Sequence, residues 1–170
     1  MRSTAKHCIP PHPACNRTPT WVFNNCQTML YCPASLVPCP CGCLLKAPHK
    51  GRSEPVAFSN CCGRYLDHFG STPAPDAEQL MRSRYSAFVL QRRDYLLATW
   101  HASTRPGLLD FEPDARWLGL EVRRHRLLGA DHAEVEFVAR YRVAGRAVRL
   151  HEHSQFVREE KQWFYVDAKD

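Results

Sequence analysis

The sequence contains no apolar run long enough for a signal peptide or a membrane-spanning helix. It also lacks a glycine-rich loop of the kind that cradles phosphate, and no serine or cysteine lies in a nucleophile motif. These absences argue against a membrane protein, a P-loop nucleotide-binding protein and a hydrolase with an activated nucleophile. We therefore expect a cytoplasmic protein whose thiols stay reduced.

Cysteine, in contrast, is abundant, with nine in 170 residues. Two close pairs, Cys39-Pro40-Cys41-Gly42 and Cys61-Cys62-Gly63, bracket a short insert. Zinc prefers four donors in a tetrahedron, and two pairs brought together by a loop supply them at little cost in chain entropy. Because the spacing is not the common C-x-x-C knuckle, the pairs alone fit a metal site or a cluster of buried or redox-active thiols equally well.

The positive charge is concentrated in the first half of the chain. The formal charge is +6, and residues 1–75 hold seven Lys/Arg against two Asp/Glu, whereas residues 76–170 hold sixteen against fifteen. A basic excess can face RNA, a ribosome or an acidic partner, or it can offset the double negative charge of a zinc ion held by four thiolates. The second explanation is simpler, and no motif for specific nucleic-acid readout is present.

The chain divides into three segments. Residues 1–37 are rich in Pro, Cys, Asn and Thr, have no helical or strand period, and are predicted to be disordered or a spurious extension. Residues 38–70 contain the cysteine module. A short linker, 71–75, rich in Pro, Ser and Thr, precedes the globular segment 76–170.

The globular segment has helical patterns first and strand patterns afterwards. Asp76 precedes Gln79 by three positions, as in a capping box, and apolar residues then recur at helical spacing to Phe88. A second helix is predicted around 93–100. From Trp117 onward apolar and charged residues alternate along four stretches separated by polar turns, of which Ala144-Gly145 is the clearest. This segregated order predicts an α+β domain with helices packed on one face of a curved four-stranded antiparallel sheet.

Short motifs spread over residues 38–170 match a known family. They are Pro38-Cys39-Pro40-Cys41-Gly42, Cys61-Cys62-Gly63-Arg64-Tyr65, Leu80-Met81-Arg82-Ser83-Arg84-Tyr85-Ser86-Ala87, Ala98-Thr99-Trp100-His101, Ser103-Thr104-Arg105-Pro106, Val135-Glu136-Phe137, Ala139-Arg140-Tyr141, His151-Glu152 and Phe156-Val157-Arg158-Glu159. The chain thus resembles the YchJ family of bacterial proteins, which joins a SEC-C zinc motif to a nuclear-transport-factor-like domain. The resemblance implies a cone-shaped domain of two or three helices on the sheet.

The resemblance also implies a cofactor and a role. Its SEC-C motif, also found at the C-terminus of SecA as an interaction module, implies that Zn²⁺ is bound by Cys39, Cys41, Cys61 and Cys62. A protein or ribonucleoprotein partner is then expected. The family's short Gly-Ser-Gly-Lys stretch is replaced here by a longer insert, 43–60, in which Cys43 and His49 are further potential ligands.

Inward-pointing polar residues suggest a second type of site. Strand parity places Glu152 and Ser154 on the same face as Phe156, where a carboxylate is costly unless it is paired. One interpretation is a buried pair between Glu152 and Arg84 that fixes helix against sheet. The alternative is a pocket in which Glu152 acts as a base and Arg84, Tyr85 or His101 binds an anionic or carbonyl ligand.

His151 and His153 are predicted to lie on the opposite face of the same strand, together with Arg149. Two histidines at alternate strand positions can bind a metal, but an exposed polar face explains them more simply. The sequence therefore favours a binding or adaptor protein with a structural zinc knuckle, and a pocket-based enzyme or small-molecule binder is the alternative.

Overall fold

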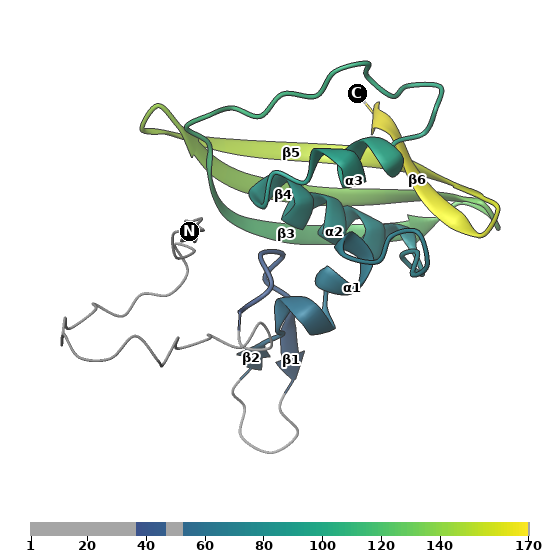
Figure 1. Cartoon of the computed structure of the whole chain (residues 1–170), viewed down its shortest axis with the longest axis horizontal. Coiled ribbons are helices and arrows are strands. Elements are labelled where there is room, and N and C mark those ends of the chain that lie inside the picture. The colour runs from purple at the N-terminus through teal and green to yellow at the C-terminus, as the bar shows by residue number, and fades with distance from the viewer. Residues whose placement is uncertain (1–36, 47–52, 170) are drawn as a thin grey trace, which may run out of the picture.

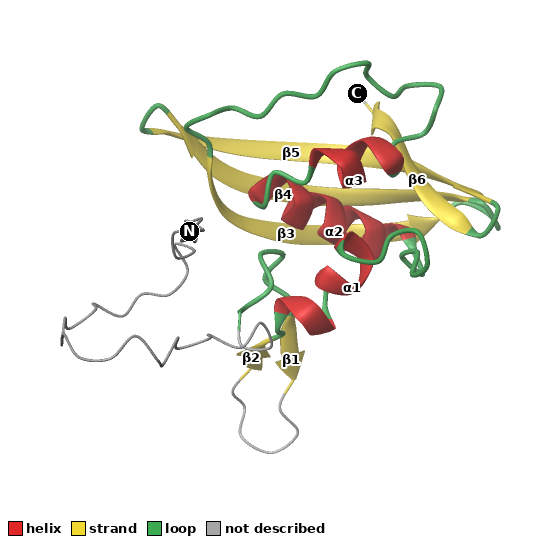
Figure 2. Cartoon of the chain, in the orientation of Figure 1, coloured by secondary structure: helices red, strands yellow, loops and turns green. Residues whose placement is uncertain are grey.

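The computed structural model describes residues 37–46 and 53–169. The predicted N-terminal extension therefore lies outside the described residues, except for its last residue, and so does His49 in the insert. The described chain forms a small cysteine module beside a four-stranded sheet whose inner face is covered by helices (Figure 1). Figure 2 shows the same arrangement by secondary structure, with long strands behind and short helices in front.

The cysteine module contains a hairpin that the sequence analysis did not predict. Strands β1 (Leu44–Lys46) and β2 (Ser53–Pro55) pair antiparallel, and a 3-10 helix (Phe58–Asn60) and helix α1 (Gly63–Leu66) follow. Each element has only three or four residues, too short for independent stability. The module must therefore gain stability from its surroundings.

Helix α2 (Ala77–Val89) begins as the capping pattern predicts. The Asp76 carboxylate accepts a hydrogen bond of 2.7 Å from the backbone N–H of Gln79, which satisfies one of the free donors of the first turn. A shorter helix, α3 (Arg93–Ala98), packs beside α2. Helix α2 contacts β3, β4 and β6, and so it is the main cover of the sheet.

The sheet is an antiparallel meander in the order β3-β4-β5-β6. Its last two hairpins turn tightly, with positive φ at Ala144-Gly145 and at Glu160-Lys161, as two-residue turns of a twisted hairpin require. The four predicted strands are present, and the α+β architecture is confirmed. The strands are β3 (Arg116–Leu127), β4 (His132–Val143), β5 (Arg146–Glu159) and β6 (Gln162–Lys169).

The register of β4 and β5 fixes which side chains face the helices. Val135 lies opposite Ser154 and Phe137 opposite Glu152, so these two polar residues do share the inner face, as strand parity predicted. The apolar core lies between this face and α2 and continues into the cysteine module. In the described part of the chain, no helix combines the length and apolar character needed to cross a membrane.

Candidate metal centre and inner cavity

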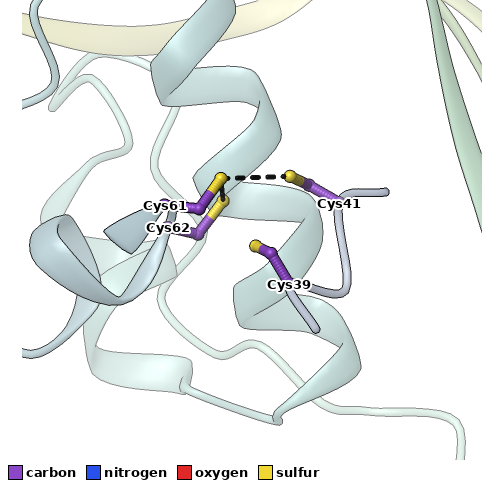
Figure 3. A group of neighbouring side chains, drawn as sticks. All are labelled: Cys39, Cys41, Cys61 and Cys62. Carbon is purple, nitrogen blue, oxygen red and sulfur yellow. Dashed lines mark hydrogen bonds between the residues drawn. The ribbon is translucent and has the colours of Figure 1, made fainter. Parts of the chain in front are cut away.

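Two short turns bring the four paired cysteines together. The first pair lies on the loop before β1, where Cys39 N donates to Val56 O at 2.8 Å and Gly42 N donates to Cys39 O at 3.0 Å. Gly42 has φ +70, a left-handed conformation that glycine adopts without strain. The second pair ends at the start of α1, so that all four sulfurs point toward one common centre (Figure 3).

The distances between the sulfurs fit a tetrahedral zinc ion. The four Sγ atoms all lie within 4.8 Å of one another. Cys41 Sγ and Cys61 Sγ are 3.6 Å apart, and Cys61 Sγ and Cys62 Sγ are 4.0 Å apart. A Zn–S bond of about 2.3 Å implies S···S separations of about 3.8 Å in a tetrahedron. The thiols therefore need little movement to coordinate a metal.

Burial and mutual contact set the electrostatics of this cluster. All four cysteines are at most 5% exposed, so bulk water cannot stabilise their thiolates. The hydrogen bond with Cys41 is the main cause that lowers the pKa of Cys39, whereas the hydrogen bond with Cys39 raises the pKa of Cys62. One cysteine of the four can thus ionise while the other three stay protonated and donate hydrogen bonds to its thiolate. A divalent cation would favour the thiolate form at all four positions.

Two neighbouring residues, Cys43 and Ser86, define the limits of the cluster. Cys43 is only half-buried and lies outside the group of four sulfurs. Cys39 Sγ contacts the hydroxyl of Ser86 at 3.7 Å, and Ser86 is fully buried in α2. The cluster is therefore attached directly to the helix that covers the sheet.

A second feature is a cavity of about 100 Å³ between α2 and the inner face of the sheet. Arg84, Tyr85, Glu152 and Ser154 line it, as do Trp100 and Tyr165. Four of the five predicted pocket residues thus meet at one place. A volume of this size holds a few water molecules and is smaller than the roughly 300 Å³ typical of the smallest ligand pockets.

Arg84 and Glu152 do not form the direct ion pair considered from the sequence. Arg84 Nη1 donates instead to Leu96 O at 2.7 Å and to Thr99 Oγ1 at 2.9 Å. Its guanidinium lies 4.6 Å from the centroid of the Tyr165 ring. A carbonyl of α3, a threonine hydroxyl and aromatic faces thus take the place of the carboxylate as partners of this side chain. Burial lowers the pKa of Arg84 to about 10, so it remains charged at neutral pH.

Glu152 is satisfied by hydroxyl groups rather than by a cation. Ser154 Oγ donates to Glu152 Oε1 at 2.6 Å, and Tyr165 OH donates to the same oxygen at 3.4 Å. Burial raises the pKa of the Tyr165 hydroxyl, which keeps it a donor. These two hydrogen bonds hold the Glu152 carboxylate in place. Its other oxygen, Oε2, accepts no side-chain hydrogen bond from the described residues.

His101 lies outside the cavity lining. Its Nδ1 contacts Ser103 Oγ at 2.6 Å, and its Nε2 contacts Glu159 Oε1 at 3.2 Å, near the surface. Trp100, its neighbour in sequence, takes the inner position instead, with its ring 4.9 Å from that of Tyr165. The sequence analysis did not assign Trp100 or Tyr165 to a site. The period-two pattern of the last strand, which pairs Trp163 with Tyr165 on one face, was the available signal for the tyrosine.

Comparisons with known proteins agree with this architecture. A family model described as "YchJ, middle NTF2-like domain" matches residues 76–168. A UPF0225 protein from Polaromonas naphthalenivorans is 67% identical over 132 residues, which cover 77% of this chain and 96% of that protein. A UPF0225 protein from Xanthomonas campestris is 51% identical over 135 residues, which cover 78% and 94% of the two chains.

Two solved structures share the fold. A SEC-C motif containing protein from Psychrobacter arcticus has a TM-score of 0.64 and 32% identity, and the match covers 79% of this chain and 82% of that one. One from Rhodopseudomonas palustris has a TM-score of 0.60 and 29% identity, with 68% and 93% covered. Fold and cysteine cluster thus define a SEC-C motif protein with an NTF2-like domain. The chain belongs to the YchJ family, whose members include the UPF0225 proteins.

Proposed function

We propose that this chain is a zinc-stabilised binding protein of the reducing cytoplasm, in which Cys39, Cys41, Cys61 and Cys62 hold one Zn²⁺. The observation that carries this proposal is the convergence of four buried sulfurs at separations that suit a tetrahedral ion. Four thiolates fill the coordination shell and leave no open position for water or substrate. The metal therefore serves the structure of the module and not a reaction.

Zinc would supply the stability that the module lacks. Its elements are three or four residues long, and Leu44 and Leu45 in β1 stay more than half exposed instead of joining the core. Structural zinc contributes on the order of 10 kcal/mol to the folding of small zinc modules at neutral pH. Such a contribution is enough to order a hairpin and a single helical turn against α2.

The exposed leucines indicate where a partner would bind. Leu44 is 54% exposed and Leu45 is 59% exposed, and both lie on an antiparallel pair of strands. Val56 N donates to Cys43 O at 2.9 Å, so the base of this hairpin is fixed beside the first cysteine pair. Successive residues of a strand point to opposite faces, so each face of the hairpin offers one exposed leucine to another macromolecule. We assign this hairpin to contact with a protein or ribonucleoprotein partner.

Removal of these leucines tests the partner surface. The double change Leu44→Asp with Leu45→Asp is expected to abolish zinc-dependent partner capture while zinc content stays at one per chain, because the leucines are exposed and are not among the four candidate ligands. Capture by tagged full-length protein, followed by mass spectrometry with and without chelator, gives the measurement. Leu108→Asp, at another exposed leucine, is the matched control and should keep the partner. Capture that is unaffected by the double change contradicts the proposed surface.

The inner cavity supports a second candidate function, the binding of a small molecule. Trp100 Nε1 is buried and has no hydrogen-bond partner in the described chain. Trp100 lines the same cavity as Arg84 and Glu152, so a cation and a carboxylate meet there beside the indole. A small polar ligand with a carbonyl or anionic group would contact the guanidinium of Arg84. The small volume makes this the weaker candidate.

Glu152→Gln separates the two functions. The amide has the same shape and Glu152 forms no ion pair in the described chain, so the melting temperature is expected to change by less than about 3 °C. Titration of wild type and variant with small carboxylates and ketones, followed by ligand-observed NMR, measures occupancy of the cavity. Wild-type binding that the variant loses at unchanged stability supports a cavity function. Equal spectra with and without these compounds count against it, and a large loss of stability assigns Glu152 to the core.

A further inference from the structure

Three potential metal ligands meet on the outer face of the sheet, away from the cysteine cluster. Glu136 lies on β4 directly opposite His153 on β5, and His151 lies two residues before His153 on the same face. Glu136 Oε1 is 2.8 Å from His151 Nε2 and 3.5 Å from His153 Nε2. Their ligand atoms all lie within 4.8 Å of one another. The carboxylate therefore stands between two imidazoles.

We propose that Glu136, His151 and His153 form a second metal site, for a divalent transition ion such as Zn²⁺ or Ni²⁺. Two imidazoles and one carboxylate are a donor set that these ions favour over Mg²⁺ or Ca²⁺. Ligands at about 2.1 Å from a tetrahedral ion are about 3.4 Å apart, close to the spacing of the pairs that include Glu136. The imidazole rings, with centroids 5.7 Å apart, need only side-chain rotation to close on an ion.

The site differs in kind from the cysteine cluster. Its side chains are partly exposed, 21% for Glu136, 40% for His151 and 49% for His153, and three ligands leave at least one coordination position open. An ion at this place would exchange with solvent and could accept a ligand from outside. The backbone that carries the ligands is nevertheless rigid, because β4 and β5 are the two central strands of the sheet.

Neighbouring charges set the expected strength. Arg124 and Arg126 from β3 line a groove that also includes Glu136 and His153. Lys169 is engaged by Glu134 at 3.1 Å, so it does not compete directly for Glu136. The positive charges of Arg124 and Arg126 repel a dication, and the single negative charge of Glu136 offsets only one of these two charges. We therefore expect binding in the micromolar range, weaker than that of a closed four-thiolate site.

Nickel titration of the full chain, loaded with one equivalent of zinc for the cysteine cluster, tests this site. Ni²⁺ is paramagnetic in octahedral sites, and amide resonances of β4 and β5 around Glu136 and His153 should broaden selectively at sub-stoichiometric ion. His151→Asn and His153→Asn should each weaken this effect about tenfold or more, because each removes one of three ligands. His132→Asn is the matched control, since His132 begins β4, is exposed and stands outside the cluster. The amide resonances of His132→Asn should broaden as those of the wild type do.

The readout is independent of the cysteine cluster. Because the broadened residues belong to the sheet, the result stands even if the cysteines prove not to bind zinc. Broadening confined to residues near the cysteines, or equal broadening in His153→Asn and wild type, overturns the proposal. Amide spectra of the variants before nickel is added should match the wild type, which shows that the fold is intact. Glu136→Gln, which keeps the shape of the side chain, should also weaken the broadening because it removes the carboxylate ligand.

Discussion

Substitution of Cys41 or Cys62 by serine is expected to abolish zinc binding by the protein. The purified, reduced wild type should contain one zinc per chain, and Cys41→Ser and Cys62→Ser should contain close to none after mild chelation. A serine hydroxyl stays protonated at neutral pH and cannot replace a thiolate as a fourth ligand. Because Cys39 contacts Ser86 of α2, disorder in the module should also lower the melting temperature by several degrees. Metal analysis and thermal denaturation give both quantities.

Cys43→Ser is the matched control for this prediction. Cys43 lies in the same module and in the same stretch of sequence, but its sulfur is outside the group of four. The variant should keep its zinc and its melting temperature. Less than one zinc per wild-type chain, or full zinc content in Cys41→Ser and Cys62→Ser, would contradict the metal assignment.

Arg84→Ala is expected to cause the largest loss of stability among single changes in the domain. The side chain is only 5% exposed, and its loss leaves Leu96 O and Thr99 Oγ1 without a charged donor. It also removes the guanidinium from its contacts with the rings of Trp100 and Tyr165 and enlarges an existing cavity. Lost hydrogen bonds, cation–π contacts and packing together should cost about 3 kcal/mol or more. Urea denaturation measures the change.

Arg82→Ala provides the comparison on the same helix. Arg82 forms an ordinary i,i+4 ion pair with Glu78 at 2.8 Å, and such pairs contribute about 0.5 kcal/mol. Its substitution should therefore have a small effect. Arg84→Lys should fall between the two alanine variants, because lysine keeps the charge but not the fork of donors. Similar losses for Arg82→Ala and Arg84→Ala would show that Arg84 does not stabilise the interior.

The features that sequence predicted well depend on neighbours along the chain. The cap at Asp76 needs only an oxygen and an N–H three residues later, and both are visible in the sequence. The alternation from Ala133 to Val143 reports which side chains share a face, whatever the strand pairs with. The convergence of the two cysteine pairs followed from their number and from the family resemblance, and the structure brings their sulfurs together.

The features that sequence missed depend on register and distance. Nothing near Glu136 in the chain shows that it stands beside His151 and His153, because that contact is set by the alignment of β4 with β5. Arg84 donates to Leu96 O and not to Glu152 because α3 lies within reach of the arginine side chain, and this placement of α3 is not visible in the sequence. The β1–β2 hairpin was missed because strands of three residues leave almost no periodic pattern.

The sequence alone therefore determined the α+β order of elements, the faces of the strands and the kind of ligand that four cysteines can offer. These are local properties, set by backbone preference and side-chain chemistry. Tertiary structure decided which groups meet: four sulfurs at coordination distance, Arg84 beside two aromatic rings, and a carboxylate between two histidines. Such meetings require strand register and helix placement, which arise from the packing of the whole core and not from any single stretch of chain.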